Sequence, residues 1–227
     1  MLNEPEISEY LNGDIKVYDN VFSPPMLDEL VRDVQSWSYL YGEVDDIDHP
    51  PTGLSTGEYD NTKTFHTLWA FLEEHVPCVS GSVVKRTHAN FFAPRELANY
   101  HVDDEGDNAW TFMFYANNNW EINQGGETKF ITNLKEEFNK QGKEVFPHII
   151  AIPPIPGRMI IFKSNILHTA TPFKDLPRFT PTIKFVPYDP EIHKEGPIRL
   201  NMKETYPWRN LWLRNIIIVG KTLKKCV

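Results

Sequence analysis

The sequence predicts a mainly β protein with flanking helices: a cupin-like double-stranded β-helix, or jelly roll, with N-terminal helices packed on one sheet. Two observations predict it. Between residues 83 and 187, short segments rich in β-branched and aromatic residues are separated by turn residues, and most have no helical pattern between them. Before residue 83, apolar residues recur at the spacing of amphipathic helices. With 227 residues, the chain suits one domain (1–227) better than two.

Residues 1–82 are expected to form a helical support for the β core. The segment Pro25 to Trp37 repeats apolar residues at helical spacing and carries acidic residues in its first turn. A second helix is expected from Thr64 to His75. Between them, residues 42–61 are acidic and contain Pro50-Pro51 and several glycines, which predicts a long surface loop. We expect this loop to act as a lid and substrate selector.

Residues 83–187 are expected to form the jelly-roll core. Turn residues such as Asn117-Asn118-Asn119 and Pro156-Gly157 separate its segments. The expected strands are 83–92, 109–116, 127–131, 148–152, 158–162 and 179–186. The remaining residues, 188–227, are a C-terminal extension, in which 206–227 is expected to form a final helix or strand over the barrel.

Composition limits the function classes. A net charge of −8 with a pI near 5.5 makes a nucleic acid an unlikely partner, because its phosphates would be repelled. No apolar run approaches the roughly 20 residues that span a bilayer. The segment Met1 to Tyr10 is polar and lacks a signal-peptide pattern, so we expect a cytoplasmic protein.

The two cysteines fit this expectation. Cys78 and Cys226 are too few for a disulfide framework and are expected to be reduced thiols.

A short motif, His101-Val102-Asp103, carries the first functional prediction. In an extended segment, residues i and i+2 point to the same face, so His101 and Asp103 can bind one metal ion together. His168 follows a predicted strand and turn, from which it can point back to the same end of the barrel. Two imidazoles and one carboxylate on one side of an ion leave the opposite positions open, the arrangement of non-haem Fe(II) oxygenases.

An anion-binding pair follows on the last predicted strand. Arg178 and Thr180 are two residues apart and so share a face. A guanidinium and a hydroxyl side by side can hold one carboxylate through charge-assisted hydrogen bonds. The sequence therefore predicts a carboxylate of a substrate or co-substrate near the metal site.

Taken together, these stretches resemble the 2-oxoglutarate and Fe(II)-dependent dioxygenase superfamily, and in particular its prolyl 4-hydroxylase-like branch. The resemblance covers roughly Asn90 to Phe185, in family order and with family-like spacing. It is carried by His101-Val102-Asp103, Tyr115-Ala116-Asn117 with Trp120, Gly125-Gly126-Glu127-Thr128 with Phe130, Pro156-Gly157-Arg158 through Phe162, His168, and Arg178-Phe179-Thr180.

The resemblance implies a jelly-roll enzyme in which His101, Asp103 and His168 bind Fe(II). It also implies that Arg178 pairs with the distal carboxylate of 2-oxoglutarate, with Thr180 and Tyr115 as hydrogen-bond partners. Relatives often carry a tyrosine upstream of the first ligand that helps to hold the proximal carboxylate. This chain has Asn90-Phe91-Phe92-Ala93-Pro94 there, so Asn90 is the candidate substitute.

The activity that the resemblance implies is hydroxylation of an unactivated C–H bond with O2, releasing succinate and CO2, with ascorbate as a supporting reductant. The expected substrate is a prolyl residue in a peptide or protein. Hydroxylation of a small molecule or nucleobase remains an alternative within the superfamily. From other classes, the alternatives are a non-catalytic jelly-roll binding module and a cupin-like metal isomerase or hydrolase. Neither of these would need Arg178 and Thr180 beside an intact set of metal ligands.

Overall fold

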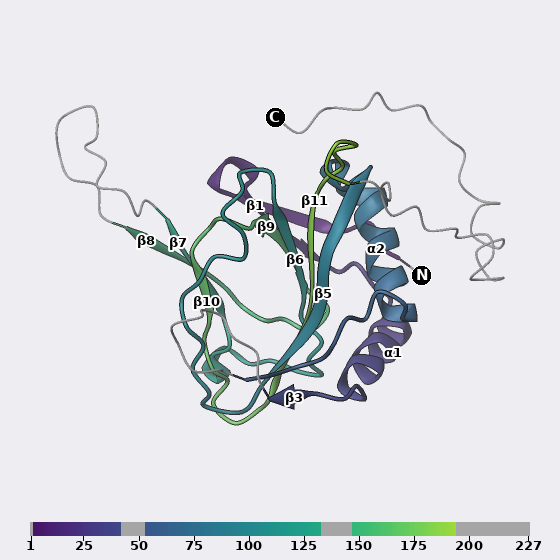
Figure 1. Ribbon diagram of the computed structural model, residues 1–227. Coiled ribbons are helices and arrows are strands. Elements are labelled where there is room, and N and C mark those ends of the chain that lie inside the picture. The colour runs from purple at the N-terminus through teal and green to yellow at the C-terminus, as the bar shows by residue number, and fades with distance from the viewer. Residues whose placement is uncertain (1, 42–52, 133–146, 194–227) are drawn as a thin grey trace.

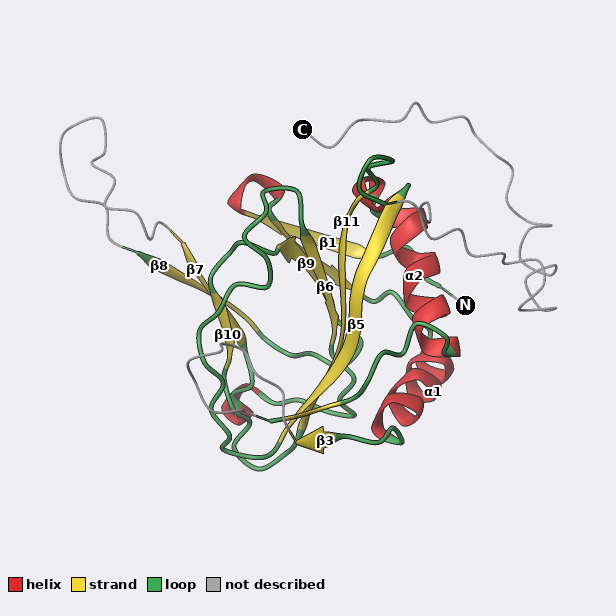
Figure 2. Ribbon diagram, viewed as in Figure 1, coloured by secondary structure: helices red, strands yellow, loops and turns green. Residues whose placement is uncertain are grey.

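The computed structural model describes residues 2–41, 53–132 and 147–193. Within these ranges two antiparallel sheets face each other, and two helices cover the outer face of the larger one (Figures 1 and 2). The predicted jelly roll with helices packed on one sheet is therefore confirmed. The helices are α1 (Pro24–Gln35) and α2 (Lys63–His75), and three short 3-10 turns are η1 (Leu11–Gly13), η2 (Pro77–Val79) and η3 (Ile122–Gln124).

The larger sheet has eight strands in the order β1-β2-β9-β6-β11-β5-β4-β3, and the smaller has three in the order β10-β7-β8. The neighbours in both sheets are antiparallel. The strands are β1 (Glu6–Tyr10), β2 (Ile15–Asp19), β3 (Leu40–Tyr41), β4 (Leu54–Ser55), β5 (Ser82–Phe92), β6 (Trp110–Phe114), β7 (Thr128–Thr132), β8 (His148–Ile152), β9 (Met159–Lys163), β10 (His168–Ala170) and β11 (Arg178–Pro187).

The two helices form where local signals favour them. Pro24 and Pro25 occupy the first turn of α1, where a missing N–H costs nothing. The hydroxyl of Thr62 caps α2 by accepting a hydrogen bond from the Phe65 amide at 3.1 Å. Both helices bury an apolar stripe against the larger sheet, and this core includes Val34, Leu68, Trp69, Phe112 and Phe185.

A second, smaller core lies between the two sheets. Its members come from facing strands and include Val17, Tyr115, Phe130, Ile152 and Phe162. Two of its members, Met113 and Phe162, also line the cavity that holds the candidate site.

The pair β5 and β11 determines which side chains reach the space between the sheets. Along β11, Phe179, Ile183 and Phe185 pack into the helix-facing core, whereas residues 178, 180, 182 and 184 line the cavity. Residues 86, 88, 90 and 92 of β5 do the same, and the register pairs each with a cavity-facing residue of β11. Two long strands thus supply eight cavity-lining positions, because side chains alternate between the faces of a sheet.

Both predicted helices and all six predicted strands are present, with boundaries that differ by a few residues. The prediction missed five strands, β1, β2, β3, β4 and β10. Every residue of β1 is exposed, which leaves no alternation of buried and exposed positions to recognise, and β3, β4 and β10 have only two or three residues. The expected element at 206–227 and most of the loop 42–61 lie outside the described residues. Among the described residues, neither α1 nor α2 has the length and apolar composition of a membrane-spanning helix.

Candidate functional site

A cavity of about 250 Å³ opens between the two sheets. Strands β5, β6 and β11 of the larger sheet form one wall, and β7 and β10 of the smaller sheet contribute Thr128, His168 and Ala170 to the other. The predicted residues His101, Asp103, His168, Arg178, Thr180 and Asn90 all line it. Positions far apart in the sequence therefore meet in one cavity.

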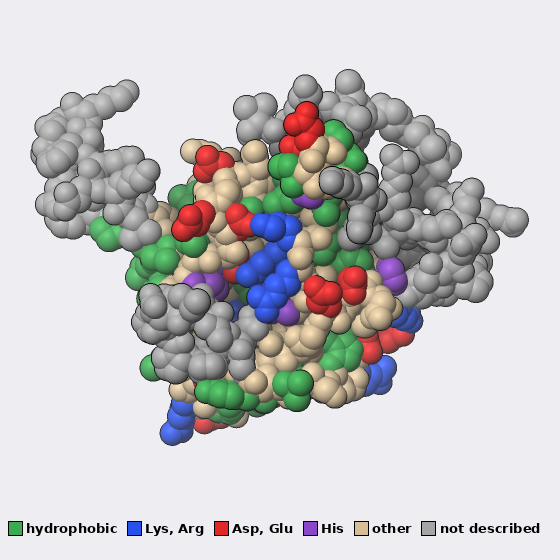
Figure 3. Space-filling model, viewed as in Figure 1, with side chains coloured by type: hydrophobic (Ala, Val, Ile, Leu, Met, Phe, Trp, Pro, Cys, Tyr) green, Lys and Arg blue, Asp and Glu red, His purple; other side chains and the backbone are tan. Residues whose placement is uncertain are grey.

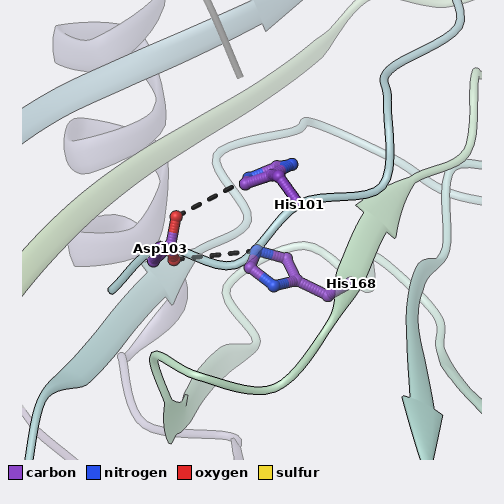
Figure 4. A group of neighbouring side chains, drawn as sticks. All are labelled: His101, Asp103 and His168. Carbon is purple, nitrogen blue, oxygen red and sulfur yellow. Dashed lines mark ion pairs between the residues drawn. The ribbon is translucent and has the colours of Figure 1, made fainter. Parts of the chain in front are cut away.

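The predicted metal ligands form one cluster (Figure 4). Nε2 of His101 lies 3.6 Å from Oδ1 of Asp103, and Nε2 of His168 lies 3.6 Å from Oδ2 of the same carboxylate. One donor atom from each of the three residues lies within 4.8 Å of the other two. The three side chains are thus close enough to surround one ion.

Backbone hydrogen bonds fix this cluster in place. His101 and His168 form an antiparallel bridge in which each amide donates to the other's carbonyl, at 3.0 and 2.9 Å. The amide of Asp103 donates to the carbonyl of Ser164 at 2.8 Å. The segment with both early ligands is therefore attached to the chain that leads into β10.

Both imidazoles are oriented for metal binding. Nδ1 of His101 lies 3.1 Å from the Asn99 carbonyl, and Nδ1 of His168 lies 2.8 Å from the Ile166 carbonyl. A carbonyl only accepts, so each Nδ1 carries the proton and each Nε2 is left with a lone pair that faces Asp103. Burial lowers the pKa of His168 to about 4, which keeps the ring neutral at physiological pH.

Asp103 is held from both sides. The hydroxyl of Thr111 donates to Oδ2 at 2.7 Å, and Nζ of Lys184 lies 2.7 Å from Oδ1. Burial alone would raise the pKa of this carboxyl group, but His168, His101 and Lys184 outweigh it and hold the pKa well below its usual range. Asp103 is therefore an oriented carboxylate, and with the two imidazoles it provides the donor set that suits Fe(II).

Arg178 is a buried cation, with 2% of its surface exposed. Its Nη2 donates to Thr128 Oγ1 at 2.8 Å, and Nη1 lies 3.5 Å from Thr180 Oγ1. Its Nε has no hydrogen-bond partner, and no carboxylate of the described residues forms an ion pair with it. Burying a guanidinium without an anion is costly. The site is therefore suited to an external carboxylate.

The other predicted co-substrate residues have different positions. Asn90 lies on the cavity wall, and its Oδ1 is buried without a hydrogen-bond partner. Tyr115 is not on the wall. Its hydroxyl lies 2.6 Å from Thr128 Oγ1, and the Arg178 guanidinium sits 5.4 Å from the centre of its ring. The structure thus places Tyr115 behind the wall, where it contacts the residues that would contact the ligand.

The sequence analysis did not assign Thr128, Thr111, Arg86, Lys184 or His88 to the site. All five line the cavity. For Lys184 a signal existed, because the two-residue period that pairs Arg178 with Thr180 continues to Thr182 and Lys184. Thr128 had no comparable signal, since its partner Arg178 lies on the opposite sheet.

Comparison with known proteins agrees with the motifs. Residues 84–185 match the family model of the 2OG-Fe(II) oxygenase superfamily. The matched range includes every residue predicted for the site, from Asn90 to Thr180. A search of curated proteins found no match.

Solved structures with the same fold belong to enzymes of several kinds. A prolyl hydroxylase of Trichoplax adhaerens, in complex with a hypoxia inducible factor oxygen degradation domain peptide fragment, is 15% identical, with a TM-score of 0.57 over 78% of this chain and 85% of that one. A Pseudomonas putida prolyl-4-hydroxylase is 13% identical, with a TM-score of 0.52 over 78% and 94%. HygX of Streptomyces hygroscopicus, with nickel, 2-oxoglutarate and hygromycin B bound, is 10% identical, with a TM-score of 0.58 over 77% and 83%. At these identities the likeness shows the fold.

Proposed function

Residues 84–185 belong to the 2OG-Fe(II) oxygenase superfamily, and on this premise we propose that the chain is a dioxygenase that hydroxylates an unactivated C–H bond. Fe(II) is its metal cofactor and 2-oxoglutarate its co-substrate, as the sequence predicted. We assign metal binding to His101, Asp103 and His168, and binding of the distal carboxylate of 2-oxoglutarate to Arg178.

The observation that carries this proposal is a buried Arg178 without an acidic partner, on the wall of the cavity that also contains the His101, Asp103 and His168 cluster. A metal-binding protein without a dicarboxylate ligand would have no need of a buried guanidinium there. The two features together match a co-substrate that binds the metal at one end and carries a carboxylate at the other. This supports the oxygenase over the non-catalytic module and over the cupin-like isomerase or hydrolase.

Bound Fe(II) and 2-oxoglutarate supply the oxidising chemistry, by activating O2 and releasing succinate and CO2. The chain itself positions the participants and limits water. Thr111 and Lys184 orient Asp103, and the Asn99 and Ile166 carbonyls orient the two imidazoles. Thr128 and Thr180 keep the guanidinium of Arg178 in place, and Asn90 presents an amide toward the same cavity. Phe92, Met113 and Phe162 add apolar surface that excludes water from the reacting centre.

We propose a prolyl residue in a peptide or protein as the substrate. The likeness of the fold to two prolyl hydroxylases, which extends over most of both chains in each comparison, supports this choice. Hydroxylation of a small molecule is the second candidate, because HygX with hygromycin B bound has a similar fold at a similar TM-score.

The test is formation of succinate from 2-oxoglutarate with Fe(II), ascorbate and air, in the wild type and in His168→Ala. We expect turnover in the wild type that depends on iron and is stimulated by a substrate peptide, which gains one oxygen atom in its mass. His168→Ala should lose both metal binding and turnover. Wild-type protein that binds Fe(II) but forms no succinate would contradict the proposal and favour a binding module.

A further inference from the structure

The carboxylate of Asp103 lies close to charged groups that are not metal ligands. Nζ of Lys184 lies 2.7 Å from its Oδ1. Figure 3 shows Lys and Arg side chains near the middle of one face of the molecule, with acidic side chains to either side. Because hydrogen bonds between oppositely charged groups are strong, a carboxylate in such surroundings can turn toward a cation and away from the two imidazoles. The group that fixes its other oxygen therefore matters for metal binding.

That other oxygen, Oδ2, is fixed by two buried hydroxyls in series. Oγ1 of Thr111 lies 2.7 Å from Oδ2 of Asp103, and Oγ of Ser164 lies 2.9 Å from Oγ1 of Thr111. Thr111 and Ser164 are each 1% exposed, and Ser164 is not among the residues that line the cavity. At this burial, each hydroxyl depends on protein partners for its hydrogen bonds.

The direction of the two hydrogen bonds follows from the number of protons available. An ionised carboxylate only accepts, so Thr111 donates its one hydroxyl proton to Oδ2 of Asp103. Thr111 then has no proton left for Ser164, and Ser164 must be the donor between the two hydroxyls. The donors run in one direction, from Ser164 through Thr111 to Asp103, and hydrogen bonds in such a chain strengthen one another.

The backbone of Ser164 holds the same part of the site. Its carbonyl accepts a hydrogen bond from the Asp103 amide at 2.8 Å, and its amide donates to the carbonyl of Ala109 at 3.0 Å. Ala109 immediately precedes β6, the strand that carries Thr111. Ser164 thus connects the turn after β9, the start of β6 and the segment that carries the first two metal ligands.

We propose that Ser164 is a positioning residue of the metal centre, which acts through Thr111 to keep the Asp103 carboxylate in the orientation it has beside the two imidazoles. This inference rests on the proposed function and adds to it a residue that is neither a ligand nor part of the cavity wall. A hydroxyl that served only the stability of its turn would affect unfolding and leave metal affinity unchanged, and this difference can be measured.

The test is the dissociation constant for Fe(II), measured by calorimetry without oxygen. Ser164→Ala removes the hydroxyl and retains the backbone hydrogen bonds, and we expect metal binding to weaken about threefold. Thr111→Val has a similar shape but no hydroxyl, and we expect a loss of about tenfold, as for other groups that orient a metal ligand. In the Thr111→Val background, Ser164→Ala should add little, because the chain of hydroxyls is already interrupted.

Two further variants separate positioning from stability. Thr111→Ser keeps the hydroxyl but removes a buried methyl group, so it should lower resistance to urea while retaining most of the metal affinity that Thr111→Val loses. The control is Thr87→Val, which removes a buried hydroxyl outside the cavity that accepts a hydrogen bond from the Tyr59 amide at 2.9 Å. This control should be less stable in urea but bind Fe(II) as tightly as the wild type.

Three outcomes would overturn the role of Ser164: unchanged metal affinity in Ser164→Ala, an undiminished effect of Ser164→Ala in the Thr111→Val background, or an equal loss of affinity in Thr87→Val. Formation of succinate by the wild type is measured on the same preparations. If the wild type binds Fe(II) and forms succinate while any of these outcomes is found, the inference fails and the oxygenase assignment stands. Wild-type protein that does not bind Fe(II) would overturn both.

Discussion

Nη2 of Arg178 donates a hydrogen bond to Oγ1 of Thr128 at 2.8 Å, so a cation of the larger sheet is held by a hydroxyl of the smaller one. The same hydroxyl lies 2.6 Å from the hydroxyl of Tyr115. Thr128 therefore links the two sheets at the point where we place the distal carboxylate of 2-oxoglutarate.

Thr128→Val should weaken 2-oxoglutarate binding while leaving metal binding intact. The substitution removes the acceptor for Arg178, and a hydrogen bond to a charged group is worth about 1.5–3 kcal/mol, or roughly tenfold or more in affinity. Calorimetry on the Fe(II)-loaded protein without oxygen measures it. Thr132→Val is the control, because Thr132 is on the same strand but bonds to the His148 carbonyl and does not line the cavity. Equal loss in both variants would argue against a specific role for Thr128.

Tyr115→Phe tests whether the tyrosine contacts the ligand or acts through Thr128. Since its hydroxyl is bound to Thr128 and is not on the cavity wall, we expect a smaller loss of 2-oxoglutarate affinity than in Thr128→Val. Part of the effect should persist in a Thr128→Val background, because the Tyr115 hydroxyl also interacts with Arg178 directly. A loss in Tyr115→Phe as large as in Thr128→Val would instead indicate that the hydroxyl contacts the ligand.

Gly126→Ala should destabilise the fold. Gly126 has φ +83°, and a Cβ there would lie 2.7 Å from the Phe173 ring. We expect a loss of about 2 kcal/mol in the free energy of unfolding, measured with urea, as for overpacking in a dense region. Gly57→Ala is the matched control, since nothing lies within 4 Å of its added carbon. A similar stability for both variants would contradict this account of Gly126.

His88 should make the metal-free protein less stable in mild acid. Its pKa is about 3 in the folded chain, because it is buried beside Lys184 and Arg86, against an ordinary value of 6.5. Below pH 6.5 the unfolded chain binds a proton that the folded chain does not, so stability falls as the pH falls toward 3. Between pH 7 and 5 this amounts to about 2 kcal/mol. Urea unfolding should show a shallower decline in His88→Gln; an unchanged decline would contradict the prediction.

The metal ligands were predictable because their signals are local. His101 and Asp103 are two residues apart in an extended segment, and His168 follows a strand and a turn. Lys184 could have been predicted by extending the same alternation from Arg178. The pairing of Arg178 with Thr128, and the position of Tyr115 behind it, could not, because they depend on how two sheets approach each other.

The strands also differ in how far the sequence predicts them, because some leave a local pattern and others depend on contacts with distant segments. Strands rich in β-branched and aromatic residues, such as β5, or with an apolar run, such as β9, were predicted, because these compositions favour strands. The three-residue β10 has too few residues to form a pattern, although it carries His168. Its pairing is set by contacts with β7 and with His101, which are distant in sequence.

The most direct test of the central claim compares two ligands on Fe(II)-loaded protein without oxygen: 2-oxoglutarate, and 2-oxobutyrate, which lacks the distal carboxylate. Wild-type protein should bind 2-oxoglutarate far more tightly. Arg178→Gln should lose that advantage while binding 2-oxobutyrate as before. The control is Arg158→Gln, because Arg158 pairs with Asp19 outside the cavity, and this variant should retain the advantage even if less stable. An advantage for 2-oxoglutarate that persists in Arg178→Gln would contradict the assignment of Arg178 and the site built around it.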